Sequence, residues 1–229
     1  MCLFLGFLVF HLGYVLRDWS DLDSPAKVNS VIITCTIIFF LSSYFLRQKA
    51  ISYSRGFKEM IYPLFCSVLP LVIYHDVELL RYINRQSVYF AGIEYILGLS
   101  ASGFFRWGVL PAFFVITGNL ISLAAIAYLK RSFSITAEAR EPVFKGIYKY
   151  IRHPLYLGEG IATLGVLVFR FSRFNIFLTT LFIVCQVVRA GVEERKLMSV
   201  FPEYILYKQK TGAFFPLLRN IPAEASDPR

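Results

Sequence analysis

The sequence predicts an all-α integral membrane protein, a bundle of helices that crosses the bilayer several times. Hydrophobic residues make up 56% of the 229 residues and aromatic residues 17%. The mean hydropathy of +0.57 is well above that of a soluble domain with a polar surface. Apolar stretches also recur along the chain, and the two clearest, 28–46 and 108–129, approach the roughly 20 residues that cross a bilayer core.

Four shorter apolar stretches complete the predicted bundle: 2–16, 60–74, 154–169 and 175–188. Read alone, each of them fits a buried helix as well as a spanning one. Their regular spacing in so apolar a chain favours spanning helices. A further stretch, 88–105, carries Glu94 and follows polar residues, so we expect it to lie in the membrane interface or to re-enter the bilayer rather than to span it.

The basic residues indicate how the bundle is oriented. The formal net charge of +9 would also fit a nucleic-acid-binding protein, but Lys and Arg concentrate in three regions: 47–58, 130–152 and the chain from Arg189 onward. Under the positive-inside rule all three regions face the cytoplasm. With an even number of crossings between the first two regions, this predicts about six spanning helices with both ends in the cytoplasm, and no nucleic-acid partner.

The stretch "IYKYIRHPLYLGEG", residues 147–160, places polar and aromatic residues where an apolar segment begins. Proline suits the first turn of a helix, so a helix is predicted to start at Pro154 with His153 at its entry. A helix start presents unpaired N–H groups and a partial positive charge, which suit an anionic ligand group. The alternative is an interfacial belt of Tyr, Lys and Arg that anchors a helix end.

A second polar cluster lies in "CQVVRAGVEERKL", residues 185–197. Arg189 and Glu193 are four residues apart and share a helix face; the alternative reading is an exposed pair worth under about 1 kcal/mol. A short turn at 170–174 predicts that this helix packs antiparallel to the helix from Pro154, which would bring His153 beside Glu193. The four cysteines have no C-x-x-C spacing, and we expect neither a metal site nor a disulfide framework.

Together these motifs resemble the isoprenylcysteine carboxyl methyltransferase family and its bacterial relatives. The resemblance rests on R-H-P-x-Y-x-G at 152–158, G-x-Y at 146–148 and R-x-x-x-E-E at 189–194, flanked by "LKRSFSITAEAR" and "FPEYILYKQKTGAFFP". It covers roughly 121–216. Two departures are a stretch at 143–148 that is one residue shorter than the eukaryotic pattern, and "FPEY" in place of the more usual F-G-x-x-Y.

The resemblance implies an integral membrane methyltransferase that uses S-adenosylmethionine and accepts a lipophilic substrate. It associates Arg189 with the reacting end of the substrate and Glu193 with the cofactor, and we expect these two residues to be catalytic. The acceptor atom stays open between a carboxylate, an amine and a hydroxyl. Glu159, in the first turn of its helix, is expected to be structural. The implied cofactor-binding residues are Pro142, Val143, Phe144, Tyr148, Arg152, His153, Pro154, Leu155, Tyr156, Glu193 and Glu194.

The predicted organisation has three parts: N-terminal membrane helices without a recognised motif (1–106), a methyltransferase-like core (107–219) and a disordered tail (220–229). The expected partners are a lipophilic or lipid-modified substrate and membrane lipid, and the active site is expected to face the cytoplasm. Two alternatives remain. One is a membrane sterol-type reductase that uses NADPH, whose relatives carry a stretch like R-H-P-x-Y-x-G. The other is a non-catalytic membrane protein of related fold.

Overall fold

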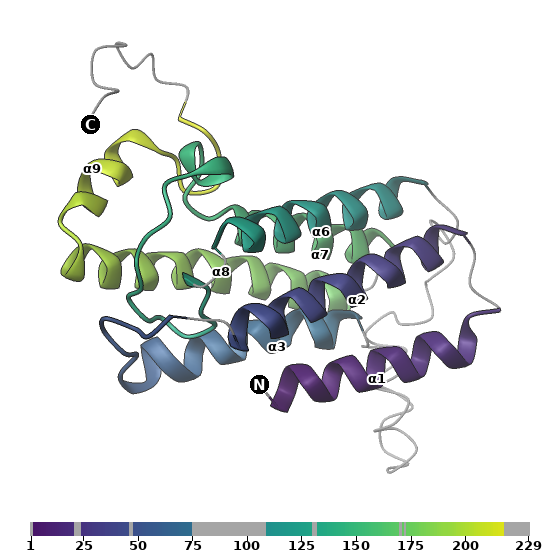
Figure 1. Cartoon of the computed structure of the whole chain (residues 1–229). Coiled ribbons are helices and arrows are strands. Elements are labelled where there is room, and N and C mark those ends of the chain that lie inside the picture. Colours follow the sequence, from purple (N-terminus) through teal and green to yellow (C-terminus); the bar gives the residue numbers. More distant parts are fainter. Residues whose placement is uncertain are drawn as a thin grey trace.

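The computed structural model describes residues 2–20, 24–45, 48–74, 109–129, 132–169, 171 and 173–217. These residues form helices and connecting segments, without a named β-strand among them (Figure 1), which confirms the all-α class. The α-helices are α1 (Cys2–Asp18), α2 (Ser24–Phe45), α3 (Tyr62–Tyr74), α6 (Val109–Leu129), α7 (Pro154–Phe169), α8 (Arg173–Val200) and α9 (Glu203–Lys210). A π-helical turn, η1 (Phe57–Ile61), precedes α3, and a 3-10 turn, η4 (Gly146–Lys149), precedes α7.

Each of the six apolar stretches predicted to span forms a helix, and α7 begins at Pro154 as predicted. The last apolar stretch, 175–188, lies within a longer helix, because α8 continues to Val200 and carries Arg189 and Glu193 as predicted. Residues 189–200 are rich in Ala, Glu, Arg, Lys, Leu and Met, which favour helix, so the polar residues do not end it. The prediction for 88–105 lies outside the described residues.

Two of the described helices are long and apolar enough to cross a membrane, Leu110–Leu129 and Arg173–Val200. Shorter apolar helices run over Leu5–Arg17, Ser30–Ser43 and Pro154–Val168. Length and composition therefore fit a helical membrane protein, and the count of six crossings stays a prediction.

Helices α6 and α7 pack against each other at close range because small residues face each other along the contact. A Cβ atom added to Gly118 would lie 2.4 Å from the backbone nitrogen of Ala162, and one added to Gly158 would lie 2.5 Å from Ser122 Oγ. Such stripes of small residues let helix backbones approach closely in membrane proteins. This contact fixes α7, whose first turn carries the predicted site.

Further helix pairs complete the bundle: α2 packs on α6, α3 packs on α8, and α1 packs on α2. Figure 1 shows η4, α9 and the segment after α9 gathered at one end of the bundle. There the carbonyl oxygens of Gly212 and Ala213 accept hydrogen bonds from the amides of Arg152 and His153, both at 2.9 Å. The residues just before α7 are thereby tied to the segment after α9.

Candidate active site

The turn before α7 depends on Gly146. Its φ of +63° lies in the left-handed region that favours glycine, and a Cβ atom there would lie 2.2 Å from the ring of Tyr128. The turn directs Tyr148 into the interior, where its carbonyl oxygen accepts a hydrogen bond of 2.6 Å from the Tyr207 hydroxyl. Burial raises the pKa of Tyr148 well above its usual value, so this phenol stays protonated and can donate a hydrogen bond.

At the start of α7, the His153 carbonyl accepts the amide of Leu157 at 3.1 Å, as expected of the residue that precedes a helix. The amides of Arg152 and His153 already donate to the segment after α9, so these two donors are engaged within the protein. Pro154 is fully buried and lines neither of the two cavities described below. Its place in the structure is that of a helix starter.

Glu194 is the centre of a buried ion cluster. Its carboxylate lies 2.7 Å from Arg152 Nε, 3.1 Å from His153 Nε2 and 2.8 Å from Lys208 Nζ. His153 and Glu193 line one cavity, as their predicted convergence requires, but the histidine pairs with the neighbouring Glu194 and not with Glu193. Adjacent residues on a helix point about 100° apart, so only one of the two carboxylates can face the histidine. Glu194 ties α7, α8 and α9 together, and it lines neither cavity.

Glu193 belongs to a separate group with Tyr156 and Arg189. The Tyr156 hydroxyl donates to Glu193 Oε1, and Arg189 Nε lies 3.3 Å from the same oxygen, which confirms the predicted pairing of residues 189 and 193. The Arg189 guanidinium also lies over the Tyr156 ring, 4.8 Å from its centroid. Its Nη2 donates to the Ile135 carbonyl at 2.7 Å, so the arginine links α8 to the segment between α6 and α7.

A first cavity, here called the polar cavity, encloses about 110 Å³ between α7, α8, α9 and the segment after α6. Of the predicted cofactor-binding residues, eight line it: Pro142, Val143, Tyr148, Arg152, His153, Leu155, Tyr156 and Glu193. Phe144, Pro154 and Glu194 do not. Phe144 instead packs edge-on against Tyr207, with ring centroids 4.7 Å apart.

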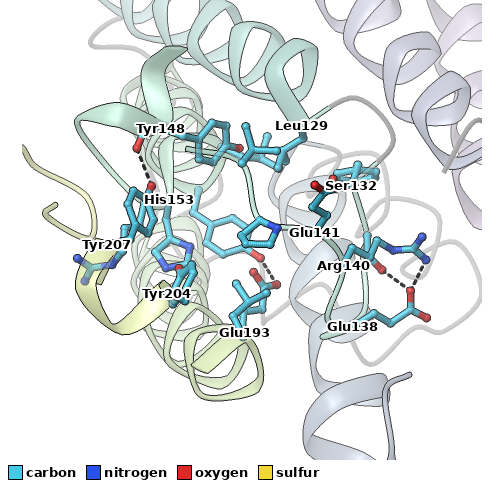
Figure 2. Close-up of a pocket in the computed structure, with 18 of the residues that line it drawn as sticks. Leu129, Ser132, Glu138, Arg140, Glu141, Tyr148, His153, Glu193, Tyr204 and Tyr207 are labelled. Carbon is cyan, nitrogen blue, oxygen red and sulfur yellow. Dashed lines mark hydrogen bonds and ion pairs between the residues drawn. The ribbon is translucent and has the colours of Figure 1, made fainter. Parts of the chain in front are cut away.

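Other residues of the polar cavity were not predicted individually. Figure 2 shows several of them on the segment after α6, facing His153 and Glu193 across the cavity. Arg140 is 5% exposed and pairs with Glu138 at 2.5 Å, but its Nε and Nη1 have no hydrogen-bond partner among the described residues. The flanking sequences that resemble the family were the only signal for nine of these residues: Leu129, Ser132, Phe133, Ser134, Thr136, Glu138, Arg140, Tyr204 and Tyr207. Glu141 and Leu197, the other two, lie outside those flanks.

A second cavity, here called the apolar cavity, encloses about 170 Å³ deeper in the bundle. Phe133 and Leu155 line both cavities, so the two adjoin. Glu159 and Arg189 are the charged residues of its lining, which otherwise consists mainly of apolar side chains from α1, α2, α3, α6 and α7. The other lining residues are Phe7, Ile33, Thr36, Ile37, Phe40, Ser67, Pro70, Ile73, Val115, Asn119, Ser122, Phe133, Ile135, Leu155, Ala162, Thr163 and Val166.

A comparison with known protein families shows which family the residues around this site resemble. The profile of the phospholipid methyltransferase family matches residues 107–203, which hold α6, α7, α8 and most of the polar cavity lining. Residues 107–203 are thus similar to the phospholipid methyltransferase family. The match supports the resemblance to membrane methyltransferases that the motifs indicated.

Two curated proteins resemble the chain over part of its length. Methanethiol S-methyltransferase 1 of Bradyrhizobium diazoefficiens is 36% identical over 94 residues, which are 37% of this chain and 30% of that protein. Cobalt-zinc-cadmium resistance protein CzcN of Cupriavidus metallidurans is 29% identical over 140 residues, 59% of this chain and 65% of that protein. The matches thus span less than two thirds of either relative. The described residues contain no group of three or more His, Cys, Asp or Glu placed to hold a metal ion.

Proposed function

We propose that this protein is an integral membrane methyltransferase that binds S-adenosylmethionine in the polar cavity and a lipophilic methyl acceptor in the apolar cavity. The observation that carries the proposal is the arrangement of two adjoining cavities of contrasting lining, which meet at Phe133 and Leu155. A methyl transfer between a polar cofactor and a lipophilic acceptor needs such an arrangement, because the two reactants must be aligned and shielded from water.

The polar cavity offers groups that fit each part of S-adenosylmethionine. When bound, the cofactor would supply a methyl group carried on a positively charged sulfur. Glu193 places a carboxylate in the lining, which would favour a cationic group nearby, and Tyr156 and Arg189 hold this carboxylate in place. The two unpartnered nitrogens of Arg140 suit a carboxylate. Tyr148, Tyr204 and Tyr207 provide aromatic surface for a flat base.

The apolar cavity suits an acceptor with a hydrocarbon body. Helices α1, α2 and α3 contribute to it in addition to α6, α7 and α8, so the N-terminal helices complete a pocket whose other walls lie in the family segment. Arg189 lines this cavity while its partner Glu193 lines the polar one. The pair therefore stands between the two compartments, and its predicted catalytic role is to orient both reactants.

A reductase that uses NADPH is favoured less. Such an enzyme needs free cations for the cofactor phosphates, and two of the basic residues of the polar cavity, Arg152 and His153, are engaged by Glu194. The similarity to a named methyltransferase points in the same direction. The alternative of a non-catalytic protein of related fold does not explain why two cavities adjoin or why the carboxylate of Glu193 lines one of them.

Cofactor binding tests the proposal directly. Purified protein in lipid nanodiscs is titrated with S-adenosylmethionine and, separately, with NADPH. We expect saturable binding of S-adenosylmethionine alone, weakened about tenfold by Glu193→Gln because a partly buried charged contact is lost. The exposed Glu203 of α9 gives a matched control, and Glu203→Gln is expected to bind like the wild type. Binding of NADPH alone, or of neither molecule, would overturn the proposal.

A further inference from the structure

Glu159 is a carboxylate in the wall of the apolar cavity that the predicted site did not include. It sits on α7, one turn after Leu155, and lines the cavity together with residues from five other helices. Its carboxylate accepts a hydrogen bond from the side-chain amide of Gln186 on α8, a residue that is 4% exposed. Both side chains thus belong to the interior of the bundle.

The charge of Glu159 is poorly compensated by the protein. Among the described residues no cationic side chain forms an ion pair with it, and Gln186 contributes only a neutral donor. Arg189 is the cation of the same lining, but its guanidinium is held by Glu193 and by the Ile135 carbonyl. A carboxylate removed from water needs several donors or a cation, so a donor is missing on the cavity side.

A structural role explains this arrangement less well. The prediction that Glu159 lies in the first turn of its helix is wrong, because the first turn of α7 holds no acidic residue and Glu159 is the sixth residue of the helix. The helix dipole acts mainly within the first turn, so it does not explain a carboxylate in the apolar cavity. Thr163 and Ser122, also in the lining, show that the cavity accommodates small neutral polar groups. A carboxylate there carries a greater desolvation cost than either of them, which a ligand that donates to it would reduce.

We infer that Glu159 selects the head group of the lipophilic acceptor: it favours a head that donates a hydrogen bond, such as an amine or a hydroxyl, and disfavours a carboxylate. This inference rests on the proposed function, in which the apolar cavity holds the acceptor. An N–H or O–H donor supplies the partner that Glu159 lacks. A carboxylate head would bring a second negative charge into the same cavity, where like charges repel strongly.

Three short probes of equal chain length separate the head groups: hexylamine, hexanol and hexanoate. Each is titrated at about pH 7, where the amine is protonated and the carboxylate ionised, into the full chain in nanodiscs, and the signal of empty nanodiscs is subtracted. In the wild type we expect hexylamine and hexanol to bind at least about tenfold more tightly than hexanoate. Equal or tighter binding of hexanoate would overturn the inference.

The isosteric change Glu159→Gln removes the charge and keeps the shape. We expect it to weaken hexylamine binding by about tenfold and to strengthen hexanoate binding, whereas Glu203→Gln leaves both unchanged. Affinities for all three probes that match the wild type would overturn the inference.

S-adenosylmethionine binding is measured in the same samples, because Glu159 does not line the polar cavity and the variant should keep it. Failure of cofactor binding in every protein overturns the proposed function alone, while an unexpected order of head groups with intact cofactor binding overturns only the role of Glu159. Since the wild-type probe series needs no variant, the test stands even if Glu159→Gln does not fold.

Discussion

Tyr156 and Glu193 are joined by a hydrogen bond between α7 and α8, donated by the phenol to a carboxylate that lines the polar cavity. The same phenol ring lies under the Arg189 guanidinium and stacks on the His153 ring. One tyrosine thus positions the cavity carboxylate, the arginine behind it and the histidine at the helix entry.

Changing Tyr156→Phe tests this relationship. The variant keeps both ring contacts and loses only the hydroxyl, so it should fold normally. We expect its affinity for S-adenosylmethionine to fall about tenfold, since a hydrogen bond to a charged group contributes about 1.5–3 kcal/mol. Isothermal titration measures the change. Tyr150 is 61% exposed and supplies the control Tyr150→Phe; an equal loss in both variants would mean that the hydroxyl has no special role.

The substitution Arg189→Lys separates two roles of the arginine. Lysine keeps a positive charge for Glu193 but cannot reproduce the planar fork. If Arg189 contacts the acceptor, transfer of a labelled methyl group to lipid extract should fall by about tenfold or more while cofactor affinity stays near that of the wild type. The exposed Arg195 on the same helix provides the control Arg195→Lys. Loss of cofactor affinity alone would instead assign Arg189 to holding Glu193.

Arg140 is predicted to recognise the carboxylate of the cofactor. Arg140→Ala should then weaken S-adenosylmethionine binding about tenfold, as expected for a charge-assisted contact, and leave the affinity for 5′-methylthioadenosine unchanged because that molecule lacks the carboxylate. Competition titrations of both ligands against the wild type and Arg195→Ala provide the measurement. A parallel loss for both ligands would show a general disturbance of the cavity.

The contact between α6 and α7 predicts contrasting effects at two glycines of the same helix. An added Cβ atom at Gly158 would meet Ser122 Oγ at 2.5 Å, whereas nothing lies within 4 Å of the corresponding position at Gly160. Gly158→Ala should therefore destabilise the protein by about 1–3 kcal/mol, and Gly160→Ala should be neutral or stabilising. Thermal unfolding in nanodiscs compares them, and similar melting temperatures would contradict the close packing.

The predicted orientation is tested with an impermeant thiol reagent on intact cells. In a cysteine-free background, Lys149→Cys near the polar cavity should be shielded, and Phe171→Cys between α7 and α8 should be labelled; both positions are exposed on the protein. Permeabilised cells show that each cysteine can react. Labelling at position 149 in intact cells would place the cavity on the extracytoplasmic side of the membrane.

The helices could be predicted from the sequence, because the length of an apolar stretch and a proline at a helix start are local signals. The pairing of Arg189 with Glu193 could also be predicted, because it depends only on helical spacing. The sequence did not show which of the two adjacent glutamates faces His153, because this depends on how α8 is rotated about its axis relative to α7. The partners of Arg152 and His153 in the segment after α9 were equally hidden, because backbone carbonyls carry no side-chain signature.

The positions of Arg140 and Glu159 in the two cavities also could not be predicted from the sequence. Each is an ordinary charged residue in the sequence, and only the folded bundle places one in the polar cavity and the other in the apolar cavity. Burial makes them noticeable, together with their incomplete pairing among the described residues: Arg140 keeps two nitrogens without a partner, and Glu159 accepts only from a neutral amide.

The two cavities draw on different parts of the polypeptide. The polar cavity is built within 129–207, whereas the apolar cavity also takes side chains from α1, α2 and α3, which precede the family segment. Substitutions in those three helices can reshape the apolar cavity without changing any residue of the polar cavity. Under the proposed function, this division would allow the preference for the acceptor to change through the N-terminal helices while the cofactor site is kept.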